Sequence, residues 1–252
     1  MDQVSENKRA YILGYPVDLI DMDNSIDFAK NCIEASNGGH VVTLNPEMIM
    51  QADHNAELSG ILKGAELVVP DGIGIIIALK KLGITNIKQL PGIEFSQALI
   101  KKCAENNYSI GLIGASKDTL DCAVNEIKAK YPDLNIVFAH DGYFNESNEN
   151  EIIEELKTKN PQVLFVALGV PKQELWIKKH RKDLNSVLMV GVGGSFDVWA
   201  KKIKRAPVIF RKFGLEWLYR LITQPSRFSR MFPTLPLFFI KVALDFKNTR
   251  KN

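Results

Sequence analysis

The sequence contains few of the residues that most often bind metals or form disulfides. Its 252 residues include three cysteines and four histidines, which are scattered and lack metal-ligand spacing. An odd number of scattered cysteines argues against a disulfide framework and indicates a reducing compartment. We therefore expect no structural disulfides, no metal site and no cofactor.

The sequence also lacks an apolar run long enough to span a membrane. Its N-terminal segment MDQVSENKRA is polar, so we do not expect a secretory signal. The longest apolar run near the C-terminus, MFPTLPLFFIKVALDF, contains two prolines and a lysine. Because a spanning helix needs about 20 apolar residues, we expect this run to lie on a membrane rather than cross it.

Charge is distributed very unevenly along the chain. Residues 201–252 include 13 basic and two acidic residues, a formal charge of +11, and the remaining 19 basic and 27 acidic residues give residues 1–200 a charge of −8. Nine aromatic residues accompany the basic ones in this tail. Cations mixed with bulky apolar side chains favour an anionic membrane surface over nucleic acid. We expect Phe238 and Phe239 to contribute to membrane docking.

Short apolar runs alternate with amphipathic segments through the first 200 residues. The predicted strands cover residues 10–14, 40–44, 67–70, 109–113, 136–139, 163–167 and 187–192. The predicted helices cover residues 25–35, 46–53, 92–106, 117–131, 149–159 and 172–180. This pattern predicts an α/β fold with a Rossmann-like, largely parallel sheet and helices on both faces. We expect residues 1–200 to form this catalytic domain and residues 201–252 a basic, aromatic helical appendage.

Polar residues follow two of the predicted strands, where ligands of open α/β sheets bind. In VVTLNPE, Thr43 and Asn45 lie two residues apart on one face of a strand end. An alternative is that Asn45 only caps the helix that Pro46 begins. In LVVPDGIGI, an apolar strand leads to Asp71 and Gly72, where the backbone can pass close to a ligand. Asp71 could act as a general base, or it could bond only to its own turn.

Two glycine-containing turns follow later strands. After the Gly-Val-Pro turn, Lys172 could approach a phosphate and Gln173 could hydrogen-bond a sugar or a base. The alternative is that both belong to a solvated first helical turn. The block GVGGSFD has three glycines in four residues, more backbone freedom than a plain turn requires, so it favours the approach of a ligand.

One acidic pattern resembles a metal-binding motif. Asp21-Met22-Asp23 matches the D-x-D sequence with which many sugar-nucleotide enzymes hold a divalent metal, and Asn24 and Ser25 follow it before a helical pattern. Asp, Asn and Ser cap helix N-termini, and a carboxylate complements the helix dipole there. We therefore interpret this pattern as a helix cap.

Arginines in the tail are candidates for binding phosphate. Arg205 begins an R-A-P block, and Arg220, Arg227 and Arg230 follow among aromatic residues. Guanidinium groups bind phosphate oxygens in bidentate fashion, so these residues suit a diphosphate. The alternative is a solvated basic face.

Seven blocks occur along residues 10–232 in an order that resembles the WecG/TagA/CpsF glycosyltransferase family. They are T-L-N-P-E, P-D-G-I-G, L-P-G-I-E, G-V-P-K-Q-E-x-W, G-V-G-G-S-F-D, R-A-P and E-W-L-Y-R-L-x-x-x-P-x-R-x-x-R. The resemblance implies an inverting transfer of N-acetylmannosamine, or a related sugar, from a UDP-sugar donor to undecaprenyl-diphosphate-linked N-acetylglucosamine. The β-linked product would enter teichoic acid, common antigen or capsule assembly.

The resemblance also implies roles for individual residues. Asp71 would be the general base, and substrate would be bound by a set comprising Thr43, Asn45, Gly72, Gln173, Arg205, Arg220, Arg227 and Arg230. The chain departs from the family pattern at three positions. Gln89 replaces a usual arginine, Glu94 a usual aspartate and Lys201 a usual glycine. The change at Gln89 removes a cation that would face phosphate, which bears on sugar choice and on activity.

We thus expect a glycosyltransferase with no metal requirement that is cytoplasmic and peripheral at the inner face of the plasma membrane. Its expected partners are the UDP-sugar donor, the lipid-diphosphate-linked sugar acceptor and the anionic membrane surface, and not nucleic acid. A non-catalytic nucleotide- or lipid-binding module of the same fold is the alternative function. Association into a homo-oligomer stays open.

Overall fold

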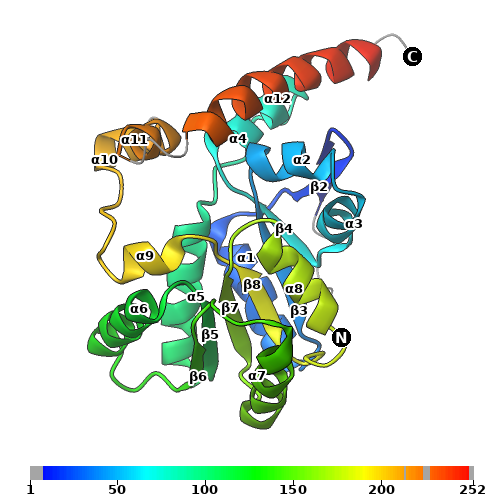
Figure 1. Ribbon diagram of the computed structural model, residues 1–252. Helices are drawn as coiled ribbons and strands as arrows, with labels where there is room; N and C mark the ends of the chain where they lie inside the picture. The colour runs from blue at the N-terminus through cyan, green and yellow to red at the C-terminus, as the bar shows by residue number, and fades with distance from the viewer. Residues whose placement is uncertain (1–7, 213, 224–227, 250–252) are drawn as a thin grey trace.

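A six-stranded parallel sheet forms the centre of the protein (Figure 1). The computed structural model describes residues 8–212, 214–223 and 228–249. The strand order is β4-β3-β8-β7-β5-β6, and every neighbouring pair is parallel. The strands are β3 (Gly39–Leu44), β4 (Leu67–Pro70), β5 (Ile110–Gly114), β6 (Ile136–His140), β7 (Val163–Ala167) and β8 (Leu188–Gly191). The predicted parallel α/β sheet is therefore confirmed.

Alternate residues of each central strand face opposite layers of helices. In β7, for example, Phe165 belongs to one buried cluster and Val166 to another. The helices over the first face are α1 (Met22–Glu34), α5 (Gly92–Glu105), α6 (Lys117–Lys130) and α9 (Ser195–Trp199). Those over the second face are α2 (Pro46–Ala52), α3 (Ala56–Gly64), α4 (Ile73–Lys81), α7 (Glu146–Lys159) and α8 (Lys172–His180). Both faces are covered, so apolar residues occupy both sides of the strands.

A small hairpin protects one edge of the sheet. β1 (Arg9–Ile12) and β2 (Tyr15–Asp18) pair in antiparallel fashion as a separate two-stranded sheet. The buried Asp18 accepts a hydrogen bond from the Val68 N–H of edge strand β4 at 2.7 Å and pairs with Arg9 at 2.7 Å. The prediction of a single strand at residues 10–14 was wrong in omitting β2. A proline and an aspartate within four residues obscure the strand pattern of β2.

Helices α3 and α4 were also missed in the sequence. α4 is apolar on almost every side, because it lies between the sheet and the C-terminal helix, so it shows no amphipathic period. α3 contains glycine within and at the end of its nine residues, which weakens its helical pattern.

The tail folds into three helices, of which the last packs on the helices of the second face. They are α10 (Val208–Lys212), α11 (Glu216–Thr223) and α12 (Phe228–Thr249). α12 packs on α2 and α4, where Phe238 is fully buried, and Lys241 pairs with Asp53. The prediction that Phe238 docks to a membrane is therefore wrong, because this ring belongs to the core. Across the described residues, no helix combines the length and the apolarity that a membrane span requires.

Candidate active site

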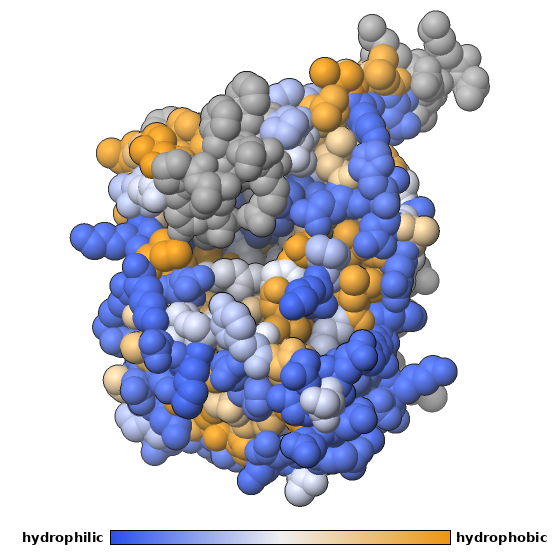
Figure 2. Space-filling model, in the orientation of Figure 1, coloured by the Kyte–Doolittle hydropathy of each residue, from blue (hydrophilic) through white to orange (hydrophobic). Residues whose placement is uncertain are grey.

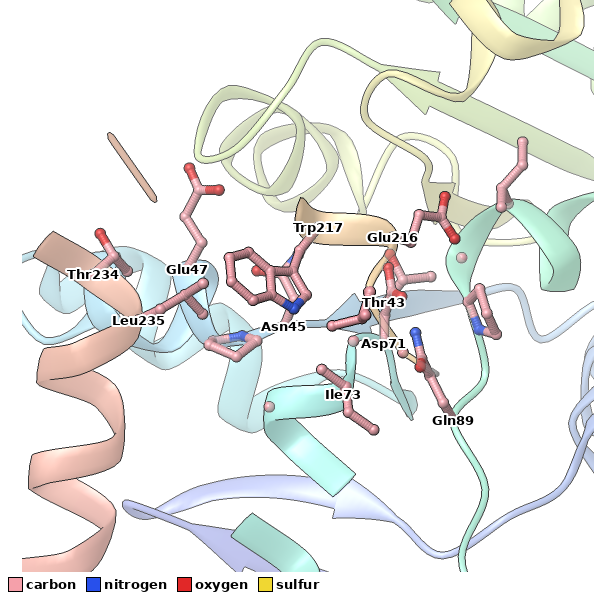
Figure 3. Close-up of a pocket in the computed structure, with 18 of the residues that line it drawn as sticks. Thr43, Asn45, Glu47, Asp71, Ile73, Gln89, Glu216, Trp217, Thr234 and Leu235 are labelled. Carbon is pink, nitrogen blue, oxygen red and sulfur yellow. The ribbon is translucent and has the colours of Figure 1, made fainter. Parts of the chain in front are cut away.

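A cavity of about 630 Å³ lies at the carboxyl ends of β3, β4 and β8, beneath α11 and α12 (Figure 3). Loops from neighbouring strands diverge here: β3 leads to α2 on the second face, whereas β8 leads to α9 on the first. Such a reversal opens a crevice at the carboxyl edge of a parallel sheet. The topology therefore places a ligand-sized cavity where the sequence predicted one.

Asp71 lines this cavity and lies directly after β4. Its side chain is half-buried, and its N–H donates to the Leu44 carbonyl at 2.8 Å, which ties the turn to β3. Gly72, which also lines the cavity, has φ +87°, a conformation that favours glycine. A Cβ at Gly74 would lie 2.6 Å from Pro46 Cγ, so the first turns of α2 and α4 are in close contact. The backbone at Asp71 is thus fixed by its hydrogen bond to β3 and by the packing of α4 against α2.

Thr43 and Asn45 line the same cavity beside Asp71 (Figure 3). The Thr43 hydroxyl donates to the Gly191 carbonyl at 3.4 Å, which joins β3 to β8. Asn45 Oδ1 accepts from the Met48 N–H at 3.1 Å, so Asn45 does cap α2. The two interpretations of Asn45 are therefore compatible, because the capping residue also faces the cavity.

Gln173 lies behind the cavity and does not line it. Its Oε1 accepts from the Gly193 N–H at 3.0 Å, and its Nε2 donates to Glu174 Oε1 at 2.8 Å. A Cβ at Gly191 would lie 2.6 Å from Gln173 Nε2 and 2.9 Å from Glu174 Oε1. In this structure Gln173 therefore positions the glycine-rich loop, whose residues Val192, Gly194 and Ser195 do line the cavity.

Glu174 is the buried carboxyl group of this arrangement. Only 1% of the residue is exposed, and burial raises its pKa to about 7. Within the described part of the chain its Oε2 has no hydrogen-bond partner. The K-Q-E block placed Glu174 beside Gln173 in sequence, but its burial depends on the packing of α8 against β8, which the sequence pattern did not reveal.

The tail closes the cavity with residues that the sequence did not single out as site residues. From α11 come Glu216, Trp217 and Leu221, and from α12 come residues 234–236 and Phe239. In the view of Figure 3 the Trp217 ring lies beside Asn45, and Glu216 lies on the side of Thr43 and Asp71. The E-W-L-Y-R block contained Glu216 and Trp217, and the T-L-N-P-E block contained Glu47, another lining residue. These two blocks were therefore the signal that could have identified them.

The walls combine polar and apolar side chains. The polar side chains of the lining are those of Thr43, Asn45, Glu47, Asp71, Gln89, Ser195, Glu216 and Thr234. Large apolar side chains form much of the rest, namely Ile73, Ile77, Leu215, Trp217, Leu221, Leu235 and Phe239. This arrangement can bring a proton-accepting carboxylate and a hydrocarbon chain into one cavity.

The predicted arginines differ in how far the structure describes them. Arg205 does not line the main cavity but pairs with Glu94 beside it. Arg227 lies outside the described residues, as do the side chains of Arg220 and Arg230. Their predicted contacts with substrate therefore stay predictions.

The D-x-D pattern begins α1. Asp21 Oδ1 accepts hydrogen bonds from the Asn24 backbone N–H at 2.9 Å and from its side-chain amide at 2.8 Å. The interpretation of Asp21 as a helix cap is confirmed. Among the residues with described side chains, no cluster of three or more His, Cys, Asp or Glu is placed to hold a metal ion.

Comparison with known proteins shows the family of the chain. The model of the glycosyl transferase WecG/TagA/CpsF family matches residues 10–252. An N-acetylglucosaminyldiphosphoundecaprenol N-acetyl-beta-D-mannosaminyltransferase of Bacillus spizizenii (strain ATCC 23059 / NRRL B-14472 / W23) is 34% identical over 199 residues, which cover 79% of this chain and 77% of the relative. The enzyme of the same name from Staphylococcus aureus (strain NCTC 8325 / PS 47) is 31% identical over 253 residues, covering 100% of this chain and 98% of the relative.

An α/β fold with a carboxylate in a cavity at the carboxyl edge of its sheet is common to enzymes of many classes, and the comparisons indicate which class applies here. The chain belongs to the glycosyl transferase WecG/TagA/CpsF family and is a glycosyltransferase. The resemblance stated from the seven sequence blocks is thereby confirmed.

Proposed function

We propose that this enzyme transfers N-acetylmannosamine from a UDP-linked donor to undecaprenyl-diphosphate-linked N-acetylglucosamine, with inversion to a β-linkage, in the assembly of a cell-surface polymer. The relatives named for this transfer match the chain over most or all of its length. The observation that carries the proposal is the cavity itself, whose lining combines the Asp71 carboxylate with large apolar side chains of α4, α11 and α12. A lipid-linked sugar likewise combines a polar sugar with an apolar chain.

Asp71 would act as general base in the transfer. Its carboxylate takes the proton from the acceptor 4-hydroxyl while that oxygen attacks the anomeric carbon of the donor. The bond from the anomeric carbon to the diphosphate oxygen breaks, and UDP leaves with the electron pair. Thr43, Asn45 and Gly72 line the cavity around this carboxylate and would orient the sugars. Proton transfer of this kind contributes about 10²–10⁴-fold to rate.

The departing diphosphate carries negative charge that the protein must stabilise. Arg205, Arg220, Arg227 and Arg230 would supply cations for it, since guanidinium groups form charge-assisted, bidentate bonds with phosphate. No step in this scheme routes through a metal. Gln173 would act indirectly, because it accepts a hydrogen bond from Gly193 and so positions the loop that lines the cavity.

The tail would also hold the enzyme at the cytoplasmic face of the membrane, where the lipid-linked acceptor is anchored. Figure 2 shows hydrophobic side chains on the outer surface of the tail helices. The exposed apolar residues of α10–α12 include Val208, Ile209, Ile222, Leu237, Ile240 and Leu244. Each Lys or Arg near an anionic membrane surface contributes about 1 kcal/mol to the binding free energy. The basic tail therefore needs only a few such contacts for reversible docking. Under this proposal residues 201–252 act as an appendage that closes the site and docks to lipid.

The test is UDP release from UDP-N-acetylmannosamine in the presence of a lipid-diphosphate-linked N-acetylglucosamine. We expect release that depends on both substrates and a product that carries one added β-linked sugar. UDP-N-acetylglucosamine in place of the donor is the matched control. Binding of the donor without turnover, at any acceptor concentration, would instead favour the non-catalytic module.

A further inference from the structure

A second, smaller cavity of about 150 Å³ lies directly beside the main one. The two share Gln89, Pro91, Gly214 and Glu216 as common walls, and Figure 3 shows Gln89 and Glu216 at the main cavity. The remaining lining of the small cavity consists of Glu94, Arg205 and Arg211. Its volume is below that of cavities that take a whole small molecule, so it suits one charged group of a larger ligand.

Two guanidinium groups meet a single carboxylate oxygen in this cavity. Arg205 Nη2 is hydrogen-bonded to Glu94 Oε1, and Arg211 Nη1 lies 3.6 Å from the same oxygen, beyond hydrogen-bond distance. Arg211 is held in place by its Nε, which donates to the Ala206 carbonyl at 3.1 Å. The Arg205 Nε is buried and has no hydrogen-bond partner within the described part of the chain. The pair therefore retains donor capacity that Glu94 does not use.

A phosphate group matches this arrangement better than a carboxylate does. Its several oxygens can accept from two guanidinium forks at once, and such charge-assisted bonds are stronger than neutral ones. Because a buried donor without a partner is costly, an anion that reaches Arg205 Nε would remove that cost. Glu94 would then serve as the counter-ion that holds both arginines in the empty site.

We propose that Arg205 and Arg211 form an anion subsite for a phosphate of the diphosphate group bound in the adjoining main cavity. The inference rests on the proposed function, in which both substrates carry a diphosphate. Arg211 is the new member of the site, and Gln89, which lines both cavities, is its neutral wall. The subsite places two guanidinium donors next to the cavity that holds Asp71, where the leaving group acquires its charge, and Glu94 and Glu216 balance their charge in the absence of ligand.

The purely structural alternative is that the ion pairs only fasten the segment before α10 to α5. Binding measurements with the full-length protein separate the two. Arg211→Gln is compared with Arg181→Gln, which removes an arginine paired with Glu66 and outside both cavities. The probes are UDP, a short-chain prenyl diphosphate and, as the ligand without phosphate, uridine. Titration calorimetry gives each Kd.

We expect Arg211→Gln to weaken a diphosphate ligand about tenfold or more, the loss expected for one charge-assisted hydrogen bond, while uridine binding is unchanged. A loss confined to UDP assigns the subsite to the donor, and a loss confined to the prenyl diphosphate assigns it to the acceptor. Arg181→Gln should leave every Kd unchanged. Wild-type affinity of Arg211→Gln for both diphosphates would overturn the proposal.

Two further variants keep the test decisive. Arg211→Lys preserves the charge but not the planar fork, so it should bind with intermediate affinity even if Arg211→Gln folds poorly. Gln89→Arg in the Arg211→Gln background should restore binding, because position 89 faces the same small cavity; no restoration would count against the shared site. Since binding needs no turnover, a failed transfer assay and a failed subsite are distinguished.

Discussion

Replacing Phe238 by alanine should destabilise the whole protein, although the residue lies in the C-terminal tail. The ring is fully buried and belongs to the same apolar cluster as Met48 of α2 and Ile75 of α4. A buried Phe→Ala change costs about 3–5 kcal/mol, because it removes apolar contact and leaves a cavity. Domains of this kind are stable by only about 5–15 kcal/mol. The variant should therefore lose a large share of its stability.

Urea denaturation measures this loss directly. The midpoint should fall while the slope stays the same, the behaviour of a change in stability alone. Ile240→Ala is the matched control on the same helix, since Ile240 is 54% exposed and such surface changes stay within about 0.5 kcal/mol. This control should instead reduce sedimentation with anionic liposomes. If Phe238→Ala unfolds at the wild-type urea concentration, α12 does not pack on α2 and α4 in solution.

Three further predictions concern pH and metal. Burial lowers the pKa of His40 to about 3. The contribution of His40 to stability should therefore fall by about 1.4 kcal/mol per pH unit from about pH 6.5 toward pH 3, because the unfolded chain takes up a proton that the folded chain does not. In urea titrations His40→Gln should be less sensitive to pH than wild type over this range, and an unchanged pH dependence would contradict a neutral, buried His40. Burial raises the pKa of Glu174 to about 7, so its contribution to stability falls as pH rises from about 4.5 to 7, by about 3 kcal/mol in total. Glu174→Gln should therefore be more stable than wild type at pH 8. Equal melting curves at pH 8 would contradict a buried Glu174 carboxyl group with a raised pKa. Replacing Asp21 and Asp23 by alanine should lower the melting temperature without abolishing transfer, and transfer should survive excess EDTA; activity that EDTA abolishes and Mn²⁺ restores would contradict a metal-independent transfer.

Much of the sheet could be predicted from the sequence because parallel strands buried on both faces are continuous apolar runs. β4 and β7 begin and end where those runs do. The convergence of Thr43, Asn45 and Asp71 was likewise predictable, since parallel strands bring their carboxyl ends to one edge. Strand β2 was not, because its pairing depends on the turn before it and on Asp18 reaching β4.

The sequence did not predict which direction individual side chains face. Phe238 and Phe239 are adjacent and equally apolar, yet one is buried in the core and the other lines the cavity. Gln173 lies in a block that implied contact with substrate, but its amide faces Gly193 because Gly191 leaves room for it. Local sequence does not encode these choices, which are made by packing between segments far apart in the chain.

The most direct test of the central claim is the turnover of Asp71→Asn with UDP-N-acetylmannosamine and the lipid-linked acceptor. Asn preserves the size of the side chain but cannot accept the proton, so turnover should fall by about 10²–10⁴-fold, with UDP affinity and melting temperature close to wild type. Asp133→Asn, at an exposed turn before β6, should turn over normally. Near-normal turnover of Asp71→Asn would contradict the assignment of this carboxylate as the general base.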